Sequence, residues 1–150
     1  MIKSKKTEMK PLFRSLADFT NAVRVDLSQP LHTDVVGVPY WQAPELLVHY
    51  NSNNTATPSP NTSASNGRTV PPYDPLKLDV WSLGSTVWEM AETVPPFFST
   101  NKFEDRWPPL SQPALYSPSF HEFLKKCSEP AGSRPSAAEL LQVRTSFSFV

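Results

Sequence analysis

The sequence predicts a mainly α-helical fold, with a short β-hairpin at its start and one long, buried helix at its centre. Residues 74–94, DPLKLDVWSLGSTVWEMAETV, predict the central helix because they are apolar at helical spacing almost all the way round. Two shorter helical patterns follow, at residues 117–127 and 136–143, and a strand-like alternation begins near residue 12. The 150 residues have the length of one domain.

The overall composition narrows the class of protein. Fourteen basic and fourteen acidic side chains balance, so the net charge gives no sign of a nucleic-acid or anionic-membrane partner. A single cysteine, Cys127, excludes an internal disulfide framework and fits a reducing compartment. No apolar run is long enough to span a bilayer, and the start MIKSKKTEMK is not followed by the apolar core of a secretory signal. We therefore expect a soluble, cytoplasmic protein.

The first elements are short. Residues 1–11 are polar and read as a lead-in to the fold. The alternation in LFRSLADF predicts a strand over residues 12–19, and residues 22–25 predict its hairpin partner. At the end of the first strand lies Asp18, whose carboxylate could ligate a hard divalent cation, although one acid alone is a weak signal against ordinary turn chemistry.

Residues 26–36 show no sustained period and predict a loop that carries Thr33 and Asp34. The block GVPYWQAPE follows at residues 37–45, with an aromatic pair, Tyr40 and Trp41, and with Pro44 as a helix start. From residue 51 to about residue 70 almost nothing can bury apolar surface, so we expect a disordered surface insertion.

The central helix has clear start and stop signals. Asp74 can cap free amides, Pro75 fits the first helical position, and the pair at residues 95–96 prevents continuation. The most regular apolar stripe on this helix comprises Leu76, Val80, Leu83, Val87, Met90 and Val94. One acid, Asp79, lies in this apolar stretch. It is either buried and held by donors from elsewhere in the fold, or a partly exposed acid in the first turn, where the helix dipole favours it.

The last third alternates irregular and helical segments. Residues 95–113 are broken by prolines and are expected to anchor on the core through Phe97, Phe98, Phe103 and Trp107. A helix after residue 117 places Phe120, Phe123, Leu124 and Cys127 on one face, which makes Cys127 a packed core thiol. Ser136 and Glu139 form a capping box for a final helix with Leu140, Leu141 and Val143. The isolated His32, His49 and His121 predict no metal or nucleophile site.

Four motifs together carry a family resemblance: Asp18-Phe19-Thr20, GVPYWQAPE at residues 37–45, DVWSLG at residues 79–84, and SRPSAAELL at residues 133–141. In order and approximate spacing they resemble the second half of the protein kinase domain, most like the PAK group of serine/threonine kinases. The resemblance implies that residues 12–150 form a kinase-like lower lobe, the C-terminal lobe, interrupted by the insertion.

The resemblance also implies roles for particular residues. Asp18 would hold Mg²⁺ on the nucleotide phosphates. The substrate-binding wall, formed with the residues that follow as far as Glu45, would comprise Gly37, Val38, Pro39, Tyr40 and Trp41. As structural anchors, Asp79 would bind backbone amides of the catalytic loop, and Glu45 would pair with Arg134. Thr33 is a candidate phosphosite, and Asp34 a fixed carboxylate in place of a phosphate.

The sequence departs from the family at several points. Thr20 replaces the glycine of the metal-binding triplet, and Val38 replaces the threonine usual after the loop glycine. The chain contains no glycine-rich phosphate loop, no nucleotide-binding lysine and no HRD catalytic loop, so no catalytic residue is assigned within it. ATP and Mg²⁺ are the cofactors implied by the family.

Three interpretations remain open. The chain is the C-lobe portion of a serine/threonine kinase that transfers phosphate to protein Ser or Thr, inactive as the isolated chain. Alternatively, it is a non-catalytic, pseudokinase-type interaction module. In either case the expected partner is a protein substrate or a kinase partner, with no nucleic acid and no membrane span. The third interpretation is an unrelated helical domain with a disordered insertion.

Overall fold

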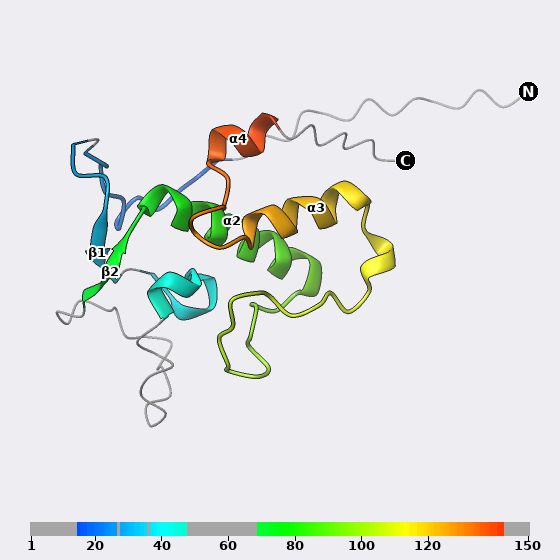
Figure 1. Ribbon diagram of the computed structural model, residues 1–150. Helices are drawn as coiled ribbons and strands as arrows, with labels where there is room; N and C mark the ends of the chain where they lie inside the picture. The colour runs from blue at the N-terminus through cyan, green and yellow to red at the C-terminus, as the bar shows by residue number, and fades with distance from the viewer. Residues whose placement is uncertain (1–14, 27, 36, 48–68, 143–150) are drawn as a thin grey trace, which may run out of the picture.

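The structure is a computed structural model that describes residues 15–26, 28–35, 37–47 and 69–142. It is mainly helical, with a two-stranded antiparallel sheet near the start, and this confirms the predicted fold class (Figure 1). In chain order the named elements are β1 (His32–Asp34), η1 (Pro39–Trp41), β2 (Thr69–Tyr73), α2 (Pro75–Glu92), η2 (Pro113–Leu115), α3 (Pro118–Cys127) and α4 (Ala137–Gln142). Residues 44–47 are also helical, as Pro44 predicts. The lead-in 1–11, His49, Val143 and the insertion up to residue 68 lie outside the described residues.

Helix α2 runs through the centre of the molecule, with α3 beside it (Figure 1). The side chain of Asp74 caps its start by accepting a hydrogen bond from the amide of Leu76 at 2.9 Å, and Pro75 occupies the first turn. The helix ends at Thr93, whose backbone is left-handed at φ 64° and whose amide donates to the Glu89 carbonyl. The C-cap therefore ends the helix before the prolines are reached. None of the helices in the described ranges has the length and apolar character needed to cross a bilayer.

The buried face of α2 shares only Val80 with the most regular apolar stripe of the sequence. Its buried residues are Leu78, Val80, Trp81, Gly84, Ser85 and Trp88. By contrast Leu76, Leu83 and Met90 are 52%, 49% and 76% exposed. Both faces are apolar, so the spacing could not tell which one is covered, and the face with the two large indoles is the one that packs. Helix α2 is thus buried along one face rather than all round.

The two-stranded sheet is built from other residues than expected. No strand forms over residues 15–25, where the described part of the predicted hairpin lies. Instead β1 arises inside the predicted loop, and β2 begins at residues 69–70, inside the predicted insertion. The strands pair His32 with Tyr73 and Asp34 with Thr69, with a bulge between. Local alternation missed them because each strand is short and its partner is distant in sequence.

The core consists of three clusters joined by Trp107, which packs against all of them. Its ring lies 4.8 Å from that of Trp81, measured between centroids. Gly84 gives it room, since a Cβ there would stand 2.2 Å from the Trp107 ring and 2.5 Å from Cys127. Phe97 and Phe103 are buried as predicted, but Phe98 is 56% exposed and is no anchor.

The last two helices follow their capping signals. Ser117 caps α3 through the amide of Phe120, and Cys127 is fully buried on that helix. Burial raises the pKa of the Cys127 thiol to about 12, so it is a packed thiol and no nucleophile. Ser136, which precedes α4, and Glu139 in its first turn form the capping box. Glu139 accepts hydrogen bonds from the amide and the hydroxyl of Ser136, and the Glu139 amide donates to the Ser136 hydroxyl.

The C-cap of α2 offers a test of backbone strain. Thr93 is β-branched and left-handed, a conformation that glycine adopts without a steric penalty. We expect Thr93→Gly to stabilise the protein by about 1 kcal/mol, read as an increased midpoint of chemical denaturation. Ser99, which is exposed and has no positive φ, is the control, and Ser99→Gly should be neutral or destabilising. Destabilisation by both changes to the same extent would contradict strain at Thr93.

Candidate functional site

Residues 37–45 form a compact segment fastened onto α2. Gly37 is left-handed at φ 92°, and its carbonyl accepts a hydrogen bond from Gln42 at 3.0 Å, which closes the turn that leads into η1. The indole of Trp41 donates to Glu89 at 2.9 Å, and the Trp41 carbonyl accepts from Ser82 at 2.9 Å. Two residues of α2 therefore fix both the side chain and the backbone of Trp41.

The outer surface of this segment is apolar and aromatic. Val38 is 41% exposed, and the half-buried Tyr40 packs against Phe98 and Phe103 with ring centroids 5.9 and 5.7 Å apart. The Tyr40 hydroxyl donates to Asn101 at 3.4 Å. The chain after α2 thus supports the aromatic side of the segment, and an apolar surface that includes Phe98 is left open to solvent.

Arg134 and Glu45, 89 residues apart in sequence, meet in a bidentate ion pair. Arg134 Nη1 lies 2.8 Å from Glu45 Oε1, and Nη2 lies 3.2 Å from Oε2. The arginine is 1% exposed and the glutamate 20%. Two parallel hydrogen bonds match the planar guanidinium fork, and a lysine could not form both of them.

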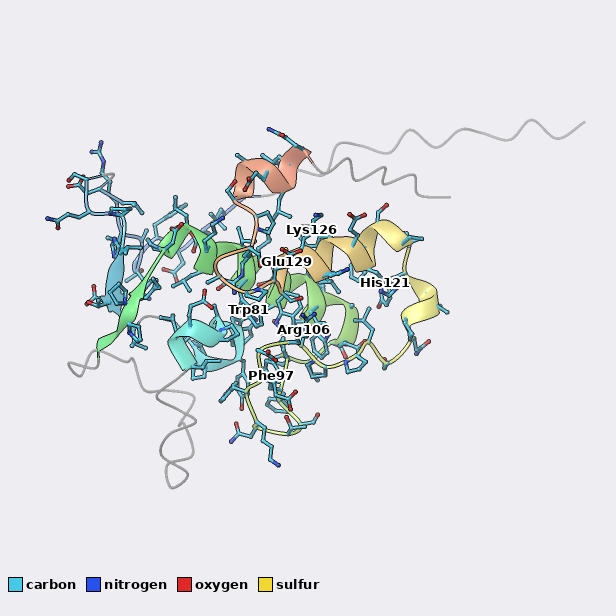
Figure 2. All side chains as sticks on the ribbon, in the orientation of Figure 1. Trp81, Phe97, Arg106, His121, Lys126 and Glu129 are labelled. Atoms are coloured by element: carbon cyan, nitrogen blue, oxygen red, sulfur yellow. The ribbon has the colours of Figure 1, made fainter. Side chains whose placement is uncertain are left out.

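Two further N–H donors of Arg134 are also satisfied. Its Nε donates to the carbonyl of Glu129 at 3.0 Å and its Nη1 to that of Lys77 at 2.9 Å. The guanidinium carbon lies 5.1 Å from the centroid of Trp81, the side chain labelled near the centre of the molecule in Figure 2. Lys77 in turn donates to the carbonyl of Arg134. This arginine therefore ties together residue 45, the start of α2 and the turn after α3.

Asp18 forms a turn with its own neighbour. Its Oδ1 accepts hydrogen bonds from the amide of Thr20 at 3.3 Å and from the Thr20 hydroxyl at 2.6 Å. These bonds lower the pKa of Asp18, the side-chain one most. Within the described residues no group of three His, Cys, Asp or Glu side chains could hold a metal ion. One oxygen of the Asp18 carboxylate is therefore engaged by Thr20, and the role of Asp18 as a Mg²⁺ ligand stays a prediction.

Asp79 is exposed and accepts no hydrogen bond from any residue in the described part of the chain. Partial desolvation beside the helix raises its pKa. Of the two interpretations open at the sequence level, the exposed acid is the one that fits the described residues, but Asp79 lies just beyond the first turn of α2, which contains no acidic residue. The side chain lies on the uncovered face of α2, between Leu76 and Leu83.

Thr33 and Asp34 lie on β1, so the candidate phosphosite is part of a paired strand rather than of a loop. The Asp34 carbonyl accepts a hydrogen bond from the hydroxyl of Tyr73 on β2. Sequence reasoning missed Tyr73 and Glu89. The available signal for Tyr73 was an aromatic residue next to a helix N-cap, which is common and not specific.

Sequence comparisons relate the chain to protein kinases. Over 135 residues it is 38% identical to serine/threonine-protein kinase dst4 of Dictyostelium discoideum, across 84% of this chain and 24% of that protein. It is 35% identical to serine/threonine-protein kinase 10 of Xenopus tropicalis, across 85% of this chain and 12% of that protein. It is 33% identical to serine/threonine-protein kinase shk1/pak1 of Schizosaccharomyces pombe, across 85% of this chain and 17% of that protein. No family model matches the chain.

The chain is therefore a relative of the serine/threonine protein kinases. Kinases of the PAK type are among the proteins to which it is similar. It spans 12% to 24% of the length of the three relatives named above, and its mainly helical fold is consistent with the C-terminal-lobe portion of such a kinase.

Proposed function

We propose that the chain is the protein-docking, C-lobe portion of a serine/threonine kinase, in which residues 37–41 form the wall that receives the polypeptide substrate. The observation that carries the proposal is the bidentate pair between Arg134 and Glu45. It fastens the end of the segment to Arg134, which in turn donates to the carbonyl of Lys77 at the start of α2. Glu89 and Ser82 hold the middle of the segment. A rigid backbone with an open apolar surface is what recognition of an extended peptide needs.

The proposal assigns no catalytic residue to this chain. Phosphoryl transfer depends on positioned phosphates, metal ions and a base for the attacking hydroxyl. The sequence supplies no glycine-rich loop, nucleotide lysine or HRD motif, and Asp18 is its one candidate metal ligand. ATP and Mg²⁺ would be held largely by kinase sequence beyond these 150 residues.

One observation favours a second candidate function, a non-catalytic interaction module. The Asp18 carboxylate is engaged by Thr20, the residue that replaces the glycine of the metal-binding triplet. Val38, which replaces a threonine, offers no hydroxyl to a catalytic site. An interaction module would keep the docking wall and lose the chemistry.

For the 150-residue chain alone we expect neither ATP affinity nor phosphate transfer, because the nucleotide pocket and the base are not encoded. Calorimetry with Mg²⁺-ATP and a radiolabel transfer assay with a protein substrate measure the two properties. Turnover by the pure chain, abolished by Asp18→Asn, would contradict this expectation.

A chimera separates the two candidate functions. The preceding kinase sequence of shk1/pak1, with its upper lobe and catalytic loop, is joined ahead of residue 15. Transfer to a protein substrate that falls at least 10-fold on Tyr40→Ala supports the kinase function. Substrate binding without transfer, again weakened by Tyr40→Ala, supports the interaction module. Failure to bind a protein substrate at all would overturn the docking wall.

A further inference from the structure

Tyr73 bridges the two strands at both ends of β1. Its backbone stands opposite His32, and its hydroxyl donates to the main-chain carbonyl of Asp34, the last residue of the strand. The ring is 6% exposed and lies in one apolar cluster with Val35. Burial, followed by the charge of Asp34, raises the pKa of the phenol, so the hydroxyl stays protonated as a donor at neutral pH.

The main-chain ladder between the strands is short of donors. Pro71 and Pro72 lie inside β2 and carry no backbone N–H. The register reflects this, since two steps along β1 correspond to four steps along β2, with the bulge between the paired positions. A two-stranded sheet is marginal without further support. The hydrogen bond from the Tyr73 side chain to β1 replaces part of the backbone hydrogen bonding that the two prolines cannot provide.

Tyr73 also connects β1 to the core. The next residue, Asp74, caps α2, so the position of the ring is fixed by the start of the central helix. Val35 and Tyr73 share their cluster with Trp81 of α2. After β1 comes the segment at residues 37–45, which is held separately, by α2 through Trp41 and by Arg134 through Glu45.

We propose that Tyr73 is a latch that holds β1 against β2 and α2, and that β1 can open at this latch while the segment at residues 37–45 stays in place. With the latch closed, Thr33 lies within a paired, core-anchored strand. With the latch open, residues 32–35 are released from their pairing with β2. This conformational device does not depend on the function proposed above, because it concerns only the order of β1.

Amide hydrogen exchange of the 150-residue chain tests the latch through Tyr73→Phe, which keeps the ring and removes the hydroxyl. We expect exchange at residues 32–35 to accelerate about 3- to 10-fold, the effect of one neutral hydrogen bond on a local opening, while exchange in α3 is unchanged. Tyr116→Phe is the matched control. Tyr116 also donates to a main-chain carbonyl, that of Ala91 at 3.0 Å, so its loss should affect the end of α2 and leave β1 unaffected.

Two results would overturn the proposal: unchanged exchange in β1 for Tyr73→Phe, or acceleration of the same size in β1 and α3, which signals general destabilisation. The unaltered chain gives an independent measurement should the variant not fold. By NMR, the Tyr73 hydroxyl proton should be slowed, relative to the exchange rate of a free phenol, by the same factor as the amides of β1 relative to free amides, because both are released in one opening. A hydroxyl proton that is protected by a much smaller factor than these amides would equally refute the latch.

Discussion

Arg134→Ala is expected to lower the free energy of unfolding by about 3–5 kcal/mol. The change removes a side chain that is 1% exposed, leaves the Glu45 carboxylate without its partner, and leaves the carbonyls of Glu129 and Lys77 without their donor. The loss should appear as a lower midpoint of guanidinium denaturation with an unchanged slope.

Arg106→Ala is the matched control, because Arg106 is an exposed arginine on the loop that carries Trp107 (Figure 2). It should change stability by no more than about 0.5 kcal/mol. Arg134→Lys keeps the charge but cannot form the two parallel bonds, so it should recover only part of the loss. In a double-mutant cycle with Glu45→Ala the effects should be strongly non-additive. Additive effects would mean that the two residues do not interact energetically.

Trp107→Ala is expected to cost about 3–5 kcal/mol, the range for removing a large aromatic side chain from a core. The indole packs against all three clusters and fills the space that the missing side chain of Gly84 leaves, so its removal opens a cavity where the clusters meet. The same denaturation experiment measures the loss. Phe98→Ala, in the neighbouring loop, removes a ring that is 56% exposed and should cost less than 1 kcal/mol.

Equal costs for Trp107→Ala and Phe98→Ala would show that Trp107 does not join the core clusters. Gly84→Ala gives an independent check, because the added methyl group would collide with the Trp107 ring and Cys127. We expect it to be destabilising by about 1–3 kcal/mol despite the better helix propensity of alanine. If Gly84→Ala left the free energy of unfolding unchanged, the space beside Gly84 would not be tightly filled by Trp107.

The sequence predicted best what is determined locally. The start of α2 at Asp74 and Pro75 and the capping box of α4 are formed as expected, because each depends on residues within one turn. The strands were wrong in position, because their pairing joins residues about 40 apart and local alternation says nothing of a distant partner. Burial of α2 all the way round was not found, because the helix is apolar on two faces and only tertiary packing selects the one that is covered.

In the candidate site, too, the features that depend on residues distant in sequence could not be predicted from local patterns. The contact between Glu45 and Arg134 came from the family resemblance, since neither residue's local pattern points to the other. The roles of Asp18 as a metal ligand and Asp79 as an anchor stay predictions, because their proposed partners are not among the described residues. Tyr73 was overlooked because its role requires a strand whose position the sequence did not reveal.

The prolines of β2 have a further consequence, for self-association. A short sheet with an open edge can template a strand from a neighbouring molecule, which is the first step toward fibrils. Two consecutive residues of β2, Pro71 and Pro72, are exposed and have no N–H to offer such a strand. The edge that depends on Tyr73 for its own pairing is therefore also a poor template, and β2 protects the molecule against edge-to-edge growth.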